Sequence, residues 1–422
     1  MAVGSAPVSR LLRVRSGALR LVPVLAAGAC LLAACGKSAG PSRSLAPVAE
    51  QGAVSVVTGN TSRIGGSDAA SDAAAVARAV YPGLTRASRP EAVVLVDEGS
   101  FQTALAASVL ASLPLNAPLL FSSGGSMPGV SSEAIESLHP LGAGSLGGAQ
   151  VVRVGSSASV PGGLHTLTLP PRAPAAAAAA VEQLLARATR SRPHQVIVVP
   201  TGASPALLMP VAGLAAQSGA PILFATAAGV PKATAGVLEH LDHPAIYVIG
   251  DGQLHHATMD ELRHFGHVTP INGTTQLGGE DRTPTGNSIA IARFTDGSFG
   301  WGIKEPGHGL VFANAARPPD GPAAALLSAS SQYGPLLVLE SAERVGAAMG
   351  TYLADIQPAY TSAPAYQPVH GVYNRGWLIG DEDMISSVTQ AEIDSLLAIS
   401  PSKQSGEEAS SQTEQSAFSP PE

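Results

Sequence analysis

Three stretches of the chain share one pattern of apolar and polar positions. Each has a short unbroken apolar run, a turn, a stretch of small residues and a second apolar run; the stretches are Ala92–Ser122, Gln195–Thr226 and Gly309–Glu340. Unbroken runs of Val, Ile and Leu are typical of strands buried on both faces, because half-buried strands alternate. Each stretch therefore predicts a strand–helix–strand unit, the building block of parallel sheets.

The spacing within these stretches indicates that they are copies of one unit. In each copy a proline stands 23 residues after a matching position of the first apolar run: Leu95 and Pro118, Val198 and Pro221, Phe312 and Pro335. A further apolar run with a glycine at or near its end follows each copy, at Val151–Gly155, Ile246–Gly252 and Trp377–Asp381. Two of these runs lead into a Thr-x-x-Glu pattern, Thr258–Glu261 and Thr389–Glu392, which predicts a capping box at a helix start.

The length of the chain fits three modules better than one. About 345 residues carry the repeated pattern, which is too many for a single core of ordinary size. We place the first repeat at residues 54–164, the second at 165–266 and the third at 267–400. Residues 401–422 contain Ser, Gln, Glu and Pro without apolar periodicity, and we expect them to be disordered.

The N-terminal segment has the pattern of a targeting sequence. In residues 1–34, four arginines precede an apolar run that is too short to span a bilayer. The run ends in Leu32-Ala-Ala-Cys35, which resembles a bacterial lipobox and implies a lipid on Cys35 as the mature N-terminus. The alternative is an ordinary secretory signal with an incidental cysteine. Residues 35–53 are small and polar, and we expect a flexible tether.

Removal of this signal peptide makes the chain more acidic and argues against nucleic acid as a partner. The segment carries four arginines and no acidic residue, so 20 basic residues remain against 31 acidic ones. A protein with that balance lacks the field that attracts nucleic acid or an anionic membrane surface. Contact with the membrane is therefore expected through the lipid, and any anionic ligand must be held by a few local arginines.

The three copies, taken in order, resemble the type 2 cell-wall-binding repeat. The resemblance is carried by Arg63-Ile-Gly-Gly-Ser-Asp68 and Gln276-Leu-Gly-Gly-Glu-Asp281-Arg282, and by the apolar runs Pro118–Phe121, Pro221–Phe224 and Pro335–Val338. That family usually has three tandem copies in surface-layer and cell-wall proteins of Gram-positive bacteria. It implies an α/β fold of three tandem Rossmann/Toprim-like modules, with small, mainly parallel sheets in a pseudo-threefold arrangement.

The resemblance also implies where a cell-wall polymer binds. In the family, binding is attributed to basic and polar residues in the clefts between modules. Carried over to this chain, these are Arg282 with Asp281, Asp320 in the third repeat and, as a weaker match, Arg172 in the second. Guanidinium groups suit the phosphates or carboxylates of such a polymer. The alternative for Arg282 and Asp320 is an ion pair that joins modules.

The chain departs from the family pattern at several of these positions. Ala69, Thr103 and Pro205 stand where the family has Arg or Asp. At most the third repeat therefore keeps the full set, and binding weaker than in the family is one expectation.

Motifs that imitate catalytic or metal sites are not supported by their context. Gly202-Ala-Ser204-Pro-Ala206 resembles a nucleophile elbow, but Pro205 has no N–H to offer an oxyanion. The motif G-x-G-x-x-G at residues 142–147 precedes a strand, whereas a dinucleotide site requires it to open a helix. Six histidines lie between His240 and His267 without a metal-binding motif. We therefore expect no enzyme activity, no metal and no cofactor.

Together these observations predict a non-catalytic, lipid-anchored envelope protein. It would lie outside the cytoplasm, held at the cell membrane and facing the cell wall, and would bind an anionic cell-wall glycopolymer through clefts between its modules. The main alternative is the solute-binding lipoprotein of a transporter, which has two lobes around one cleft in place of three equivalent units.

Overall fold

The computed structural model describes residues 56–274, 279–329, 333–358 and 373–400. The expected signal peptide, Cys35, the tether, the tail at 401–422 and part of the Gln276–Arg282 motif lie outside the described residues. Among the described helices, none combines the length and apolar character needed to cross a membrane.

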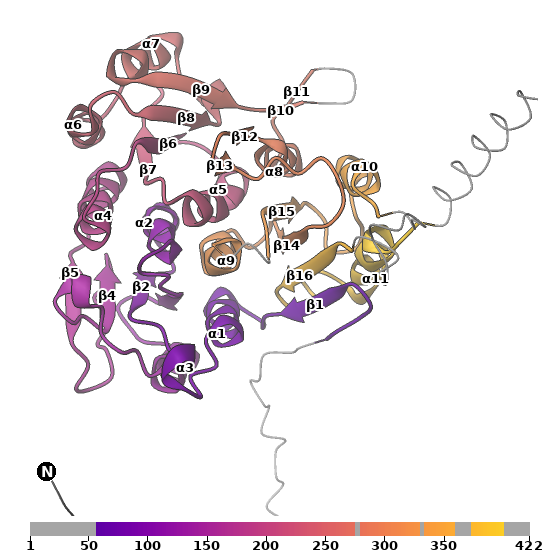
Figure 1. Ribbon diagram of the computed structural model, residues 1–422, viewed down its shortest axis with the longest axis horizontal. Helices are drawn as coiled ribbons and strands as arrows, with labels where there is room; N and C mark the ends of the chain where they lie inside the picture. The colour runs from indigo at the N-terminus through magenta and orange to yellow at the C-terminus, as the bar shows by residue number, and fades with distance from the viewer. Residues whose placement is uncertain (1–55, 275–278, 330–332, 359–372, 401–422) are drawn as a thin grey trace, which may run out of the picture. The chain divides into compact units, whose positions relative to one another are not determined.

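Three four-stranded sheets form the frame of the described chain, and every pairing within them is parallel (Figure 1). The first has the order β3 (Leu119–Ser122), β2 (Val93–Asp97), β4 (Val151–Val154), β5 (Thr166–Leu169). The second has the order β7 (Ile222–Ala225), β6 (Gln195–Pro200), β8 (Ala245–Ile249), β9 (His267–Ile271). The third has the order β15 (Leu336–Leu339), β14 (Gly309–Asn314), β16 (Arg375–Ile379), β1 (Thr61–Ile64).

The predicted strand–helix–strand units are present, one in each sheet. Their helices are α2 (Phe101–Ala107), α5 (Pro205–Ser218) and α9 (Asp320–Ser328). The strands that the unbroken apolar runs predicted are buried on both faces, as at Leu95, Val198 and Phe312, which have no exposed surface. The fold class of small parallel α/β modules is therefore confirmed.

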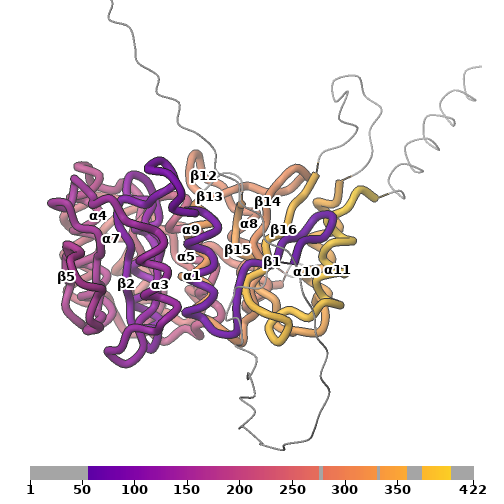
Figure 2. The backbone as a smooth tube through the Cα atoms, turned by 90° about the horizontal axis from the view of Figure 1, so that it is seen from below, coloured from indigo at the N-terminus to yellow at the C-terminus, as the bar shows by residue number. Residues whose placement is uncertain are grey.

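The outer strand of each sheet comes from the beginning of the next repeat. β5 completes the first sheet, β9 completes the second, and β1, from the start of the described chain, completes the third. In the last case Thr61 pairs with Gly376 and Ile64 with Ile379, and both views of the backbone show β1 beside β16 (Figures 1 and 2). The intervals 54–164, 165–266 and 267–400 thus mark copies of the sequence pattern, while the sheets extend across those boundaries.

The helix that follows each exchanged strand packs on the central helix of the preceding repeat. α1 (Ala69–Val80) contacts α9, α4 (Pro174–Thr189) contacts α2, and α8 (Pro284–Arg293) contacts α5. The helices α2, α5 and α9 also contact one another pairwise. Small residues permit the close contact of α5 with α9, because a Cβ on Gly321 would lie 2.9 Å from the Cα of Met209.

The remaining helices and strands cover the sheets or connect them. They are α3 (Gly129–Leu138), α6 (Lys232–Leu241), α7 (His256–Phe265), α10 (Ala347–Asp355), α11 (Ser387–Leu397), and the short strands β10 (Gly273–Thr274), β11 (Glu280–Asp281), β12 (Thr295–Asp296) and β13 (Phe299–Gly300). Equivalent hydroxyls anchor α3 and α6, since Ser131 donates to Phe121 O and Thr234 to Phe224 O, each at 2.7 Å.

The two predicted capping boxes are wrong. Helix α7 begins two residues before Thr258, and α11 begins two residues before Thr389. The threonine hydroxyls instead donate to Ala227 O at 2.9 Å and Ala342 O at 2.7 Å. Glu261 and Glu392 accept the backbone N–H groups of Val230 and Val345, at 3.0 and 2.9 Å. The repeated pattern therefore holds a loop against the helix, in the same way in both repeats.

Candidate binding sites at the seams between repeats

Each sheet has a point where a ligand site is expected on topological grounds. From the first strand of each unit the chain goes to a neighbour on one side and then returns to a neighbour on the other side. In open α/β sheets, ligands bind beyond the carboxyl ends of the strands at this switch point. The loop and helix that begin the next repeat lie here. We call these places the first seam (first and second repeats), the second seam (second and third) and the third seam (third and first).

The second seam contains a cavity of about 260 Å³. Its wall is formed by the residues that follow β8, by the short strands β10 and β11, and by the ends of α5 and α8: Leu207, Gly250, Asp251, Gly252, Gln253, Asn272, Gly273, Asp281, Arg282 and Asn287. Two of the predicted binding residues, Asp281 and Arg282, are therefore brought together at a switch point.

Arg282 lies over the backbone of the second repeat. A Cβ on Gly252 would lie only 2.4 Å from the Arg282 guanidinium carbon, so the glycine leaves the space that the guanidinium fills. Its Nη2 pairs with Glu280 Oε2 at 2.5 Å, and the side chain is 61% exposed. The guanidinium is thus positioned at the rim of the cavity while most of its donors face solvent.

Asp281 and two asparagines fix the other walls of this cavity. Asp281 Oδ1 accepts from Thr283 N at 3.1 Å and from Thr283 Oγ1 at 2.7 Å. The buried Asn287 donates to Leu207 O across the seam at 2.7 Å, and Asn272 donates to Asp251 Oδ2 at 3.2 Å. Sequence reasoning missed both asparagines, because neither lies in the motifs that carry the resemblance.

The third seam is closed by buried charges in place of a cavity wall. Arg317 Nε donates to Asp320 Oδ2 at 2.9 Å, and Arg317 Nη2 pairs with Asp72 Oδ2 at 2.7 Å. Both aspartate side chains are fully buried. Asp72 lies on α1 of the first repeat, whereas Arg317 lies in the loop before α9 and Asp320 is the first residue of α9 in the third repeat, so the three charges join the two repeats. Asp72 Oδ1 also accepts from Gly66 N at 2.5 Å.

This group of charges corrects one expectation and changes another. An ion pair between Arg282 and Asp320 is contradicted, because Arg282 pairs with Glu280 and Asp320 with Arg317. The predicted contact between the polymer and Asp320 stays a prediction. The structure adds that the Asp320 carboxylate is fully buried. The sequence analysis did not identify Arg317 as a seam residue, because no motif in Ala315–Pro319 indicates that it forms ion pairs.

The two aspartates of the third seam share a proton over part of the pH range. Burial raises the pKa of Asp72 to about 9, helped by the neighbouring Asp320 charge and opposed by Arg317. Burial likewise raises the pKa of Asp320 to about 6, against the effect of Arg317. Between these two pKa values the pair of carboxyl groups as a whole holds one proton.

Arg63 holds the exchanged strand β1 in the third sheet. The side chain is 1% exposed, and its guanidinium donates to three carbonyls beyond β16 and to one amide: Gly380 O, Asp381 O, Ile385 O and Gln390 Oε1, at 2.6–3.1 Å. Gly65 is required beside it, since a Cβ there would lie 2.3 Å from Gly380 N. Arg63 and Gly65 of the Arg-Ile-x-Gly pattern therefore have a structural role: they hold β1 of the first repeat against the residues that follow β16 in the third.

The first seam contains no charged pair among the described residues. Thr103 stands beside Gly155, where an added Cβ would lie 3.2 Å from Thr103 Cγ2, and Gln102 donates to Thr201 O at 3.2 Å. Arg172, expected here, is exposed and lines a separate groove of about 880 Å³ between α4 and α6. Arg172 is therefore not brought together with Asp281 and Arg282.

Comparison with known proteins supports the fold. Two solved structures, the cell-wall proteins Cwp6 and Cwp8 from Clostridium difficile, match with TM-scores of 0.59 and 0.57, each at 17% identity and over 80% of this chain. The chain shares their fold. It covers 48% of the length of Cwp6 and 52% of that of Cwp8, so it spans about half of each neighbour. The sequence matches no family model and no curated protein.

The motifs that resembled catalytic or metal sites have structural positions. Ser204 is the N-cap of α5 and Pro205 its first residue. Glycines 142 and 147 lie in a loop before β4 with positive φ angles of 99° and 67°. Within the described residues, no three or more His, Cys, Asp or Glu side chains are grouped so that they could hold a metal ion.

Proposed function

We propose that this chain is a non-catalytic protein of the cell envelope that binds an anionic cell-wall glycopolymer in the second seam. The observation that carries the proposal is the cavity at the switch point of the second sheet, where Arg282 and Asp281 meet Asp251 and Asn272. A guanidinium at the rim suits a phosphate or carboxylate, and carboxylates with amides suit sugar hydroxyls. The fold shared with two cell-wall proteins supports the envelope location.

The proposed attachment to the membrane is a lipid on Cys35. The apolar run before Cys35 and the small residues around it support this part. A polymer held in the second seam would then lie outside the cell membrane, on the side of the wall.

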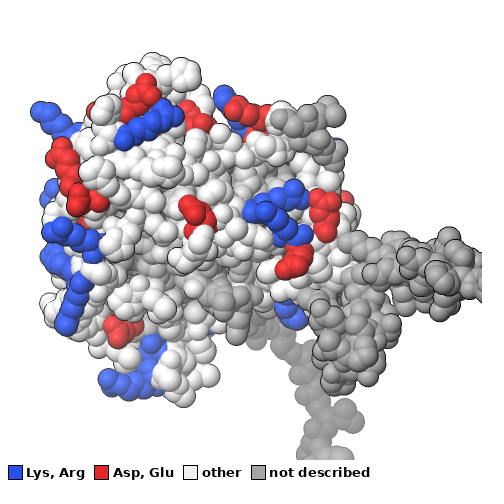
Figure 3. All heavy atoms as spheres, turned by 45° about the horizontal axis from the view of Figure 1, so that its top comes forward, with Lys and Arg blue, Asp and Glu red and all other residues white. Residues whose placement is uncertain are grey.

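Surface charge favours local over general recognition of the polymer. On the face seen in Figure 3, basic and acidic side chains are interspersed, without a broad area of one sign. An anionic polymer would therefore be held at a few positions such as Arg282, and its binding would weaken with salt through those contacts.

The alternative of a solute-binding lipoprotein has less support. It calls for two lobes around one cleft, whereas the described residues form three sheets of the same strand order.

Sedimentation with purified cell walls tests the proposed function. Residues 36–422 contain every described element and avoid lipidation. We expect this protein to co-sediment with native walls and to remain in the supernatant with walls stripped of their secondary polymers. Arg282→Ala should weaken binding at least five-fold, because the cavity loses its cation.

Arg263 offers a matched control for that variant. It too is an exposed arginine in an ion pair, with its Nη1 at 2.6 Å from Asp260 Oδ1, but it lies on α7 outside the cavity. Arg263→Ala should bind walls like the unchanged protein. Equal binding to native and stripped walls, or equal weakening by both substitutions, would contradict the proposal.

A further inference from the structure

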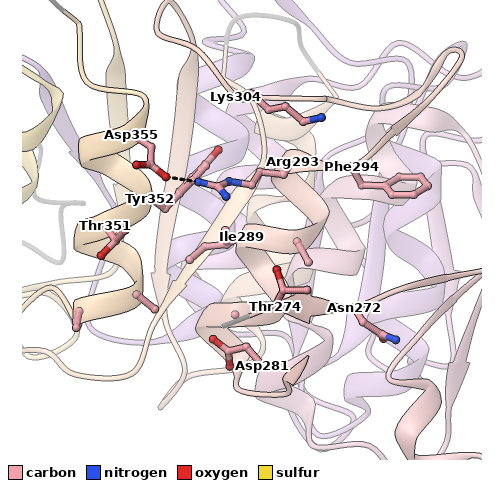
Figure 4. A pocket seen from close by; sticks show the side chains of 14 residues that line it. Asn272, Thr274, Asp281, Ile289, Arg293, Phe294, Lys304, Thr351, Tyr352 and Asp355 are labelled. Carbon is pink, nitrogen blue, oxygen red and sulfur yellow. Dashed lines mark hydrogen bonds and ion pairs between the residues drawn. The ribbon is translucent and has the colours of Figure 1, made fainter. Parts of the chain in front are cut away.

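A groove larger than the second-seam cavity lies on the third repeat, between α8 and α10 (Figure 4). Its volume is about 770 Å³, within the range of small-molecule sites. It meets the second seam at Asn272 and Asp281, which line both spaces. Its other residues belong to the third repeat, and neither the resemblance nor the proposed function assigns them a role.

One end of the groove has a fixed guanidinium and a free ammonium group. Arg293 Nη2 pairs with Asp355 Oδ2 at 2.6 Å, and the guanidinium carbon lies 5.0 Å from the ring centre of Tyr352. Tyr352 is 1% exposed, so it is a rigid support. Figure 4 shows Lys304 at the same end of the groove, with its ammonium group directed away from the Arg293 guanidinium, and Lys304 has no ion pair among the described residues. This end can therefore hold a carboxylate through the remaining guanidinium donors, and Lys304 adds positive charge there.

The other end presents a carboxylate. Figure 4 shows Asp281 well separated from Arg293 and Lys304, with Ile289 between them. Both hydrogen bonds from Thr283 go to Oδ1 of Asp281, which leaves Oδ2 for a ligand. Since Asp355 is already paired with Arg293, Lys304 and Asp281 remain as one unpaired charge of each sign among the described residues that line the groove.

Small apolar side chains line the space between these charges. They are Ile289 and Ala290 of α8 and Ala347 and Ala348 of α10, and the aromatic side chain of Phe294 also lines the groove. Asn272 and Thr274 supply amide and hydroxyl groups at the side of Asp281. This lining suits short alkyl side chains joined by peptide groups, whereas a uniformly anionic chain would face both Asp281 and Asp355.

We propose that the groove between α8 and α10 binds a short zwitterionic peptide with small side chains. Its carboxylate lies against Arg293, at the end of the groove where Lys304 adds positive charge, and its ammonium group lies against Asp281. The groove shares Asp281 and Asn272 with the second-seam cavity, but Lys304, Arg293 and the alanines of α10 lie outside that cavity, so variants at these positions test the peptide site separately from the polymer site.

Titration calorimetry of residues 36–422 with tri-alanine and its capped forms tests the inference. We expect tri-alanine to bind at millimolar concentration. Amidation of its carboxylate and acetylation of its amine should each weaken binding at least five-fold. Lys304→Ala should weaken binding of tri-alanine at least three-fold but leave the affinity of the amidated peptide unchanged, and Lys304→Arg should restore it.

The controls separate this site from a general charge effect and from polymer binding. Lys232→Ala removes another exposed lysine, on α6, and should leave tri-alanine binding unchanged. Thermal unfolding of each variant checks that the fold is intact. No heat with tri-alanine, equal binding of capped and uncapped peptides, or an equal loss with Lys232→Ala would overturn the inference. Competition of polyglycerol phosphate for the groove, abolished by Lys304→Ala, would also overturn it in favour of a polyanion.

Discussion

The second and third seams have the same backbone frame but use charge in opposite ways. In both, the loop and first helix of one repeat lie over the strand ends of the preceding repeat. The third seam buries Arg317 with Asp72 and Asp320, whereas the second leaves Arg282 61% exposed beside a cavity. One seam therefore joins the first and last repeats, and the other leaves charge available to a ligand.

The difference shows that burial, more than residue type, decides whether a group of Arg and Asp side chains joins two repeats or remains available to a ligand. A buried pair is costly to desolvate and strongly destabilising when one partner is removed. An exposed pair contributes little to stability, so its arginine can change partners at small cost. By sequence alone the two seams carried similar residue types, and only the packing distinguishes them.

The largest effect is expected from breaking the buried group. Arg317→Met should lower the free energy of unfolding by about 3–5 kcal/mol, because it leaves two buried carboxyl groups without a cation. Urea denaturation followed by circular dichroism measures this. Arg263→Met provides the control at an exposed ion pair and should change stability by less than about 1 kcal/mol. Similar values for both variants would mean that the buried charges do not join the repeats.

A smaller effect is expected from the proton that Asp72 and Asp320 share. The folded chain holds this proton with pKa values of about 9 and about 6, whereas in the unfolded chain both groups ionise near pH 4. Groups with a raised pKa in the folded state stabilise it at low pH, and this contribution is lost as the pH rises through the folded values. Between pH 6.5 and pH 9.5, roughly, stability should fall by on the order of 2 kcal/mol.

Asp320→Asn separates this effect from other titrations. The amide at position 320 does not ionise, so Arg317 then faces a single titrating carboxyl group, that of Asp72. We expect the variant to have a much flatter dependence of unfolding free energy on pH, measured by urea denaturation across the same range. A slope equal to that of the unchanged protein would show that the pair does not retain a proton.

The sequence predicted the sheets better than the joints between them. Unbroken apolar runs and the 23-residue spacing located three strand–helix–strand units, because burial on both faces leaves a local pattern. The exchange of edge strands leaves no local pattern, since β1 pairs with β16 at the opposite end of the chain. The capping-box predictions at Thr258 and Thr389 failed for a related reason. Their hydroxyls donate to carbonyls of loops that are distant in sequence, which the local Thr-x-x-Glu pattern does not reveal.

The candidate site was predicted only in part. Asp281 and Arg282 were found through a motif, and the structure places both at a cavity. Asn287, Asn272 and Gly252 were missed because each acts through a neighbour on another repeat: an acceptor at Leu207, a carboxylate at Asp251, and the guanidinium of Arg282. Such pairings become visible only when the repeats are packed together.

The smallest effect on stability, with a clear effect on binding, is expected from a glycine of the second seam. In Gly252→Ala the new Cβ would displace only the flexible end of Arg282, so the free energy of unfolding should change by less than about 1 kcal/mol. Wall binding should weaken, because the guanidinium leaves the cavity rim. Gly65→Ala in the third seam is the matched comparison: there the Cβ would meet the backbone at Gly380, and unfolding should become easier by about 2 kcal/mol or more. Urea denaturation and wall sedimentation of both variants test whether one seam is rigid and the other adaptable, and equal losses of stability would mean that the two seams are packed alike.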